Sequence, residues 1–164
     1  MQFLFKYSWG VFIIVTILNA VIIRVRSKKY VQDKPELAEC YRKCFTSILI
    51  YGNIPWVIMG IGSLSGATNN TFEYLDPKTL NPFVLAFHGS IFILWVLSAY
   101  WIYLKNGAEF IGTHPGIINK KGIGGSSNVT AREVKMFFPL ILAGGVIGMA
   151  MAWLTEIPAL NFWS

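Results

Sequence analysis

Charged side chains are scarce in this sequence. Asp, Glu, Lys and Arg make up 13% of its 164 residues, against roughly 25% in a typical soluble domain, which argues against a water-soluble fold. About 20 apolar residues cross the roughly 30 Å hydrocarbon core of a membrane as a helix, so we looked for runs of that length without charge. Four such runs occur, at residues 7–23, 44–72, 79–104 and 136–155.

These runs predict the fold class: an all-α, integral membrane four-helix bundle. The whole chain, residues 1–164, is then a single membrane domain. The spans are expected at approximately 5–24, 44–64, 82–104 and 136–155, with cytoplasmic connections at 25–43 and 105–135.

Cysteine is equally scarce, since Cys40 and Cys44 are the only two. They are expected at the cytoplasmic mouth of the second span, where reducing conditions argue against a disulfide. Two thiols four residues apart do not complete a tetrahedral zinc site. We interpret both as small residues that pack between helices.

Acidic residues are few, eight against 14 Lys and Arg, and the basic excess is unevenly placed. All but Lys6 and Lys78 lie in the two predicted cytoplasmic connections or, for Arg24, directly before the first of them. The positive-inside rule places these connections in the cytoplasm of a bacterial inner membrane, with both termini outside. The asymmetry predicts contact with anionic lipid headgroups and argues against nucleic-acid binding. The basic residues concerned are Arg24, Arg26, Lys28, Lys29, Lys34, Arg42, Lys43, Lys105, Lys120, Lys121, Arg132 and Lys135.

The connections contain no catalytic motif. The glycines of "GIGGSSNVTARE" do not follow the order of a phosphate-binding loop, so we predict a flexible stretch there. Thr130 with Glu133 three residues later forms a capping box that starts the fourth span. In the shorter connection, Asp33 is expected to cap a short helix with Pro35 in its first turn.

Polar residues inside the second and third spans suggest a polar bundle centre. Pro55 cannot donate to the carbonyl of Tyr51, so the second span should kink there. Asn53 and Trp56 lie beside this break. In the third span, His88 and Trp95 fall on one stripe that should face the bundle interior, because both need hydrogen-bond partners away from lipid. We expect His88 to hydrogen-bond with Asn53, Trp56 or Trp95.

Small residues repeat every four positions in the fourth span, at Gly144, Gly148 and Ala152. This spacing leaves a groove that admits the backbone of a neighbouring helix. The pattern predicts a packing face without deciding whether the neighbour belongs to this chain or to another subunit.

Only two histidines occur, which limits the haem sites available. His88 and His114 are separated by roughly 24 Å along helix between 88 and 104 alone, so one haem iron cannot bind both. A His and Met pair could still hold haem or copper. The candidate ligands at one depth are His88, Met59, Met149 and Met151. No catalytic residue, metal or cofactor is expected, because methionines in a membrane core are usually apolar filler.

The segments "YGNIPWVIMGIG" and "NPFVLAFHGSIFILWVLSAYWIYLKNGAEF", with the nearby "HPGI", resemble a group of small bacterial four-span membrane proteins that has no established activity. The resemblance covers nearly the whole chain. It implies no catalytic or binding residue. It places the following residues in recognisable local patterns: Asn53, Pro55, Trp56, Asn81, Pro82, Gly107 and Glu109.

Three functions are compatible with this pattern. The first is a non-enzymatic accessory or assembly subunit of a larger membrane complex, because the segments outside the spans are short and the fourth span offers a docking face. The second is a small transporter or a proton or ion conduit through the polar centre. The third is a redox protein that holds haem or copper through His88 and a methionine.

Overall fold

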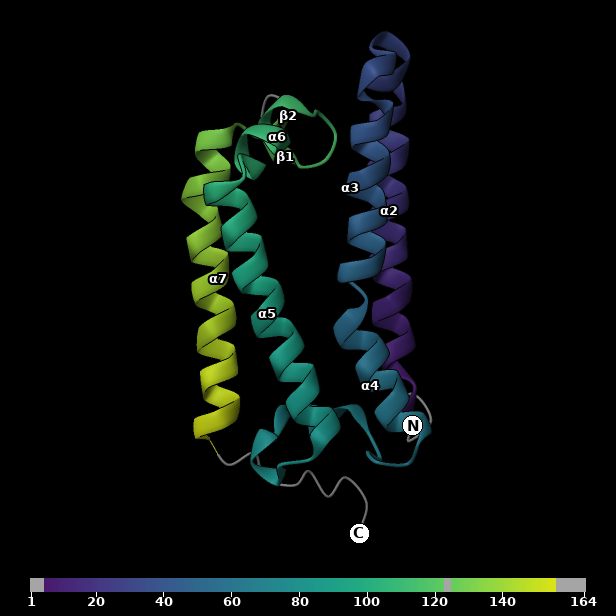
Figure 1. Cartoon of the computed structure of the whole chain (residues 1–164), viewed down its shortest axis with the longest axis vertical. Coiled ribbons are helices and arrows are strands. Elements are labelled where there is room, and N and C mark those ends of the chain that lie inside the picture. The colour runs from purple at the N-terminus through teal and green to yellow at the C-terminus, as the bar shows by residue number, and fades with distance from the viewer. Residues whose placement is uncertain (1–4, 123–124, 156–164) are drawn as a thin grey trace.

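The computed structural model describes residues 5–122 and 125–155 (Figure 1). Within these residues, four helical segments are long and apolar enough to cross a membrane: Ser8–Asp33, Pro35–Leu64, Pro82–Leu104 and Ala131–Leu154. Each overlaps one of the four apolar runs of the sequence, which confirms the prediction of four such helices.

Helices α2 (Ser8–Asp33) and α3 (Ala38–Tyr51) lie side by side, as do α5 (Pro82–Leu104) and α7 (Ala131–Leu154) (Figure 1). Helix α4 (Ile54–Leu64) continues the direction of α3 and packs against both α2 and α5. The short helix α6 (Gly107–Thr113) and the strands lie at the opposite end of the molecule from the connection between α4 and α5 (Figure 1).

The first connection is almost entirely helical. Helix α2 runs on through the basic stretch to Asp33, and the turn at Lys34 leads directly into the 3-10 helix η1 (Pro35–Leu37) and α3. Arg, Lys and Gln are good helix formers, which favours this extension. The predicted role of Asp33 is wrong: the residue that precedes η1 is Lys34, and no side chain caps it. Pro35 does lie in the first turn, as expected.

The second span is broken where Pro55 predicts a kink. Helix α3 ends at Tyr51, and α4 begins at Ile54 with Pro55 in its first turn. Backbone N–H groups in the first turn have no acceptor within the helix, so the N–H that proline lacks is not needed there. Gly52 lies at the break. A Cβ there would lie 3.1 Å from the Thr16 methyl carbon of α2, so a small residue lets the two helices approach closely.

The connection between α4 and α5 folds into a compact plug. Its 3-10 helices η2 (Thr71–Leu75) and η3 (Pro77–Thr79) pack on α5. The Asn81 side chain caps α5 by accepting from the N–H of Phe83, and its amide donates to the carbonyl of Ala67 at 2.7 Å. We call this end of the molecule, with the plug formed by residues 65–81, the terminal end.

Both ends of the described chain reach the terminal end. Ser63 donates to the carbonyl of Lys6 at 2.8 Å, and Thr71 donates to the carbonyl of Phe5 at 2.6 Å. At the other end of the chain, the Lys78 ammonium donates to the carbonyl of Leu154 at 3.5 Å. The first and last helices therefore end beside the same connection.

The opposite end, with the turn at Lys34, α6 and the strands, is here called the basic end. Strands β1 (Asn119–Gly122) and β2 (Gly125–Asn128) pair in antiparallel fashion, with Asn119 opposite Asn128. This pairing departs from the all-α prediction, since the backbone of the glycine-rich stretch expected to be flexible is hydrogen-bonded. The predicted capping box is confirmed: Thr130 and Glu133 bond each other's backbone N–H at the start of α7.

Helix α6 covers the basic end of the α5–α7 pair. Ala108 and Ile111 form a buried cluster with Ile102 of α5 and Val134 of α7. The Lys135 ammonium donates to the Glu109 carboxylate at 2.6 Å. This hydrogen bond, helped by the positive charge of Lys135, lowers the pKa of Glu109 below its ordinary value.

The long helices expose much apolar surface. On α5, His88 of the predicted inward stripe is buried together with Val84 and Ile102 on the same face, whereas the opposite face is open. A contiguous apolar surface of this kind marks contact with lipid or with a partner. The exposed residues on the middle of the helices include Val11, Ile14, Leu18, Phe92, Ile93, Val96, Leu140, Ile141 and Ile147.

Candidate functional site

His88 ties α5 to the plug at the terminal end. It is 7% exposed, and its Nε2 lies 2.8 Å from the carbonyl oxygen of Tyr74. A carbonyl only accepts, so Nε2 carries the proton and donates. Nδ1 is buried and, among the described residues, has no hydrogen-bond partner. The expected partners Asn53, Trp56 and Trp95 are thus wrong, because the histidine bonds a backbone atom.

Tyr74 is the centre of this packed end. Its ring is 1% exposed, and its hydroxyl donates to the carbonyl of Met59 at 3.2 Å while accepting from the Thr68 hydroxyl at 3.3 Å. Burial raises the pKa of the Tyr74 phenol, which keeps it a neutral donor. A Cβ at Gly62 would overlap the Tyr74 hydroxyl oxygen, so only glycine allows this approach.

Asn53 and Trp56 lie at the helix break but make separate contacts. The Asn53 amide donates to the Leu49 carbonyl of α3 at 2.7 Å, and its oxygen is buried without a hydrogen-bond partner in the described chain. The Trp56 ring stacks on Phe12 with centroids 4.4 Å apart and tilts against Phe87 at 5.8 Å. Trp56 therefore acts as an aromatic link between α2, α4 and α5.

Trp95 faces α7. Its ring lies over Gly145, where a Cβ would approach ring carbon Cζ2 to 2.6 Å. In the part of the chain that the structure describes, no hydrogen bond or ring contact joins any two of the four residues predicted as a polar centre. Those four residues are Asn53, Trp56, His88 and Trp95.

The small residues of α7 divide into covered and open positions. Gly145, which the sequence analysis did not single out, is the one covered by Trp95. At Gly144 and Gly148 an added Cβ would meet no described atom within 4 Å, and Ala152 is half-buried. The predicted packing face is thus left open by the described residues of this chain.

The predicted metal ligands lie in different surroundings. Met59 is 3% exposed within the cluster of Tyr74, Val84 and Phe87. Met151 is 57% exposed on α7, and Met149 is half-buried one turn from Trp153, whose ring faces His88 at 6.0 Å. Among the described residues, no group of three or more His, Cys, Asp or Glu could hold a metal ion. Cys40 and Cys44 are both free thiols.

A clasp at the basic end joins α3 to the segment after α6. The Tyr41 hydroxyl donates to the carbonyl of Pro115 at 2.8 Å, and its ring lies edge-on to His114 at 5.4 Å. Gly116 has φ +91° and packs on the backbone of Arg26, with 3.3 Å between its Cβ position and that backbone. Sequence reasoning missed Tyr41, although "HPG" signals a turn after His114.

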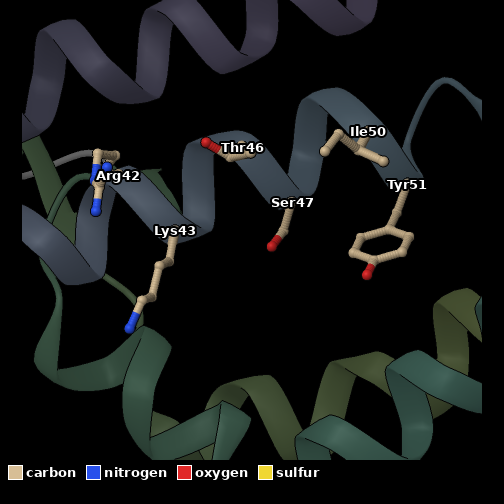
Figure 2. Close-up of a pocket in the computed structure, with 6 residues that line it drawn as sticks. All are labelled: Arg42, Lys43, Thr46, Ser47, Ile50 and Tyr51. Atoms are coloured by element: carbon tan, nitrogen blue, oxygen red, sulfur yellow. The ribbon is translucent and has the colours of Figure 1, made fainter.

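Between the clasp and the plug, one face of α3 lines an open pocket of about 470 Å³. Figure 2 shows Lys43, Ser47 and Tyr51 pointing from α3 toward the side where the α5 and α7 ribbons lie. Helix α3 is not among the elements that pack closely on α5 or α7 in the described residues. The residues that line the pocket are Arg42, Lys43, Thr46, Ser47, Ile50 and Tyr51.

Comparison with protein-family models, with curated proteins and with solved structures found no match to this chain.

Proposed function

We propose that this chain is a multi-pass protein of a bacterial inner membrane and acts as a non-enzymatic accessory or assembly subunit of a larger membrane complex. The observation that carries the accessory role is the open face of α7, where Gly144 and Gly148 have no described neighbour although Gly145 on the same helix is tightly covered. The occupant proposed for this face is a transmembrane helix of a different protein.

Membrane insertion is supported by the exposed apolar residues along α2, α5 and α7. Water would have to cover this surface in a soluble monomer, whereas lipid tails are themselves apolar. The basic residues collect at the end with the Lys34 turn and α6, so the positive-inside rule places the basic end in the cytoplasm and the terminal end outside. Anionic headgroups are the partners proposed for the basic end.

A partner helix is favoured on α7 by the physics of packing in lipid. Helices in a bilayer associate through close van der Waals contact, and small residues every four positions permit that contact. Trp95 already shows how Gly145 admits a ring. Gly144 and Gly148 lack side chains in the same way, so a partner helix could approach the α7 backbone as closely on their face.

Photo-crosslinking in native membranes tests the accessory role. A benzophenone amino acid at Ala152 is expected to give one discrete adduct with a different membrane protein, and the pair Gly144→Leu and Gly148→Leu is expected to reduce its yield at least tenfold. The matched control is Gly10→Leu with Gly89→Leu, since these glycines also have no described atom within 4 Å of an added Cβ. A benzophenone at Val96, 53% exposed on α5, controls for contact by chance.

Adducts between two copies of this chain, or equal yields in the two double variants, would contradict the proposal. The conduit is less favoured because Asn53, His88 and Trp95 make separate contacts and do not converge. The redox alternative predicts a Soret band or bound copper in protein purified in mild detergent. A colourless sample without copper would reject it.

A further inference from the structure

The side chains that line the pocket on α3 change along the helix from charged to largely apolar. Lys43, Thr46, Ser47, Ile50 and Tyr51 recur at the spacing of one helical face, and Arg42 lies beside them at the same end. At 1.5 Å per residue, the face extends about 12 Å from Lys43 to Tyr51. Cationic groups therefore stand near the basic end, with hydroxyls and then apolar surface farther along the helix.

Some helix hydroxyls bond a carbonyl of the preceding turn, whereas those on this face, like that of Ser98 in α5, make no hydrogen bond among the described residues. Elsewhere in the helices, Thr16 donates to the Phe12 carbonyl at 3.0 Å and Ser90 donates to the Phe87 carbonyl at 2.7 Å. In the described residues, Thr46, Ser47 and Tyr51 make no hydrogen bond, although all three line the pocket. Lipid tails offer the Thr46 and Ser47 hydroxyls no hydrogen-bond partner, so acceptor oxygens of a bound molecule would stabilise them.

The charged groups of Arg42 and Lys43, at the basic end of the pocket, are also free to bind an anion. Lys43 lies 2.9 Å from Glu39, but the two side chains are 72% and 62% exposed, and an exposed pair of this kind is weak and readily exchanged. Lys and Arg side chains at the cytoplasmic end of a transmembrane helix attract anionic lipid headgroups.

We propose that this pocket binds one anionic phospholipid. Arg42 and Lys43 hold its phosphate, the hydroxyls of Thr46 and Ser47 donate to its glycerol and ester oxygens, and one acyl chain lies along Ile50 and Tyr51. A free phosphate would use the cations alone. The order of cations, hydroxyl donors and apolar side chains along α3 instead matches a molecule that is anionic at one end and apolar at the other. This proposal rests on the membrane orientation proposed above and is independent of the accessory role.

The test uses delipidated full-length protein in mild detergent. Native mass spectrometry and thermal unfolding are recorded with added palmitoyl-oleoyl phosphatidylglycerol, with phosphatidylcholine of the same chains, and with inorganic phosphate. The expected result is one retained phosphatidylglycerol, at least tenfold tighter than phosphatidylcholine, with a rise in Tm that inorganic phosphate does not reproduce.

Two double variants locate the site. Arg42→Gln with Lys43→Gln is expected to weaken phosphatidylglycerol binding at least tenfold. Lys28→Gln with Lys29→Gln removes the same charge from α2 at the same end and is expected to change binding less than twofold. Should the first variant fail to fold, Thr46→Val with Ser47→Ala keeps the charges and is expected to weaken retention several-fold.

Equal losses in the two charge variants would overturn the site, because they would mean diffuse attraction to the whole basic end. The proposal also fails if phosphatidylcholine binds as tightly, if inorganic phosphate gives the same stabilisation, or if a second copy of the chain occupies the α3 face. A normal Ala152 crosslink in the Arg42→Gln, Lys43→Gln variant would show that the accessory role stands without the lipid site.

Discussion

The two halves of the molecule are packed in different ways. Toward the terminal end, α4, α5 and the plug enclose Met59, Tyr74, Val84 and Phe87, and Gly62 is small enough to admit a tyrosine hydroxyl. Toward the basic end, α3 does not pack closely on α5 or α7 in the described residues (Figure 1), and the clasp joins the two sides through Tyr41 with Pro115 and Gly116 with Arg26.

This difference shows where the fold is fixed and where it is free to bind. In the terminal half, two hydrogen bonds join the helices to the plug: His88 donates through Nε2 to the Tyr74 carbonyl, and the Tyr74 hydroxyl donates to the Met59 carbonyl. The α3 face in the other half leaves Thr46 and Ser47 unpaired in the described chain. The packed terminal half thus holds the helices together, while the α3 face in the other half is free to contact lipid.

The largest expected effect comes from removing a large buried side chain from the packed half. Phe87→Ala removes a ring that contacts Trp56, Tyr74 and His88, and the cavity should lower the free energy of unfolding by about 3 kcal/mol. Phe92 on the same helix is 58% exposed, so Phe92→Ala should change the free energy of unfolding little. Denaturation in detergent measures both. Similar losses for the two variants would mean that the terminal half is no better packed than the lipid-facing surface.

Overfilling the same half should have the next largest effect. Gly62→Ala places a methyl group against the Tyr74 hydroxyl and the Phe83 ring, and the displacement should destabilise the protein by about 2 kcal/mol. Gly89→Ala is the control, because no described atom lies within 4 Å of its added Cβ. Thermal unfolding compares the two, and an unchanged Tm for Gly62→Ala would contradict the close approach.

A smaller effect is expected at the clasp. Tyr41→Phe removes the hydrogen bond to the Pro115 carbonyl, which should lower stability by about 1 kcal/mol. Hydrogen exchange should then speed up at residues 114–118. Tyr103→Phe, which removes a comparable bond to the Lys135 carbonyl within the α5–α7 pair, should leave exchange in that segment unchanged. Equal exchange in the two variants would mean that Tyr41 does not hold the clasp.

The smallest effect is the pH dependence of the Glu109–Lys135 pair. Because the hydrogen bond from Lys135 lowers the folded-state pKa of Glu109 below 4.5, the ionised pair stabilises the fold above that pH. The contribution is lost as pH falls through the lowered pKa. Between pH 6 and pH 3 the Tm of the wild type should therefore fall slightly more than that of Glu109→Gln. Parallel curves would show that the pair contributes nothing.

The sequence predicted local features well because their causes are local. Pro55 has no N–H to donate and lies in the first turn of α4, just after the break in the second span, and Thr130 with Glu133 caps α7 through neighbouring backbone groups. The partner of His88 could not be predicted, since Tyr74 offers a backbone carbonyl from an irregular connection.

Helix faces were harder to assign than helix positions. Lipid and protein interior are both apolar, so hydrophobicity does not say which face of α7 is covered. Gly144 and Gly145 are adjacent glycines, and only the position of Trp95 selects the second. The strand pair was missed because Gly and Ser favour turns and give no alternating apolar pattern.

The orientation of the packed and open halves across the membrane is tested most directly by cysteine labelling in intact cells. In a background with Cys40→Ser and Cys44→Ser, one variant carries Asn69→Cys in the plug and another carries Ser127→Cys in β2. A membrane-impermeant maleimide should label position 69 in intact cells and position 127 only after permeabilisation. Labelling of position 127 in intact cells, with position 69 protected, would contradict the account.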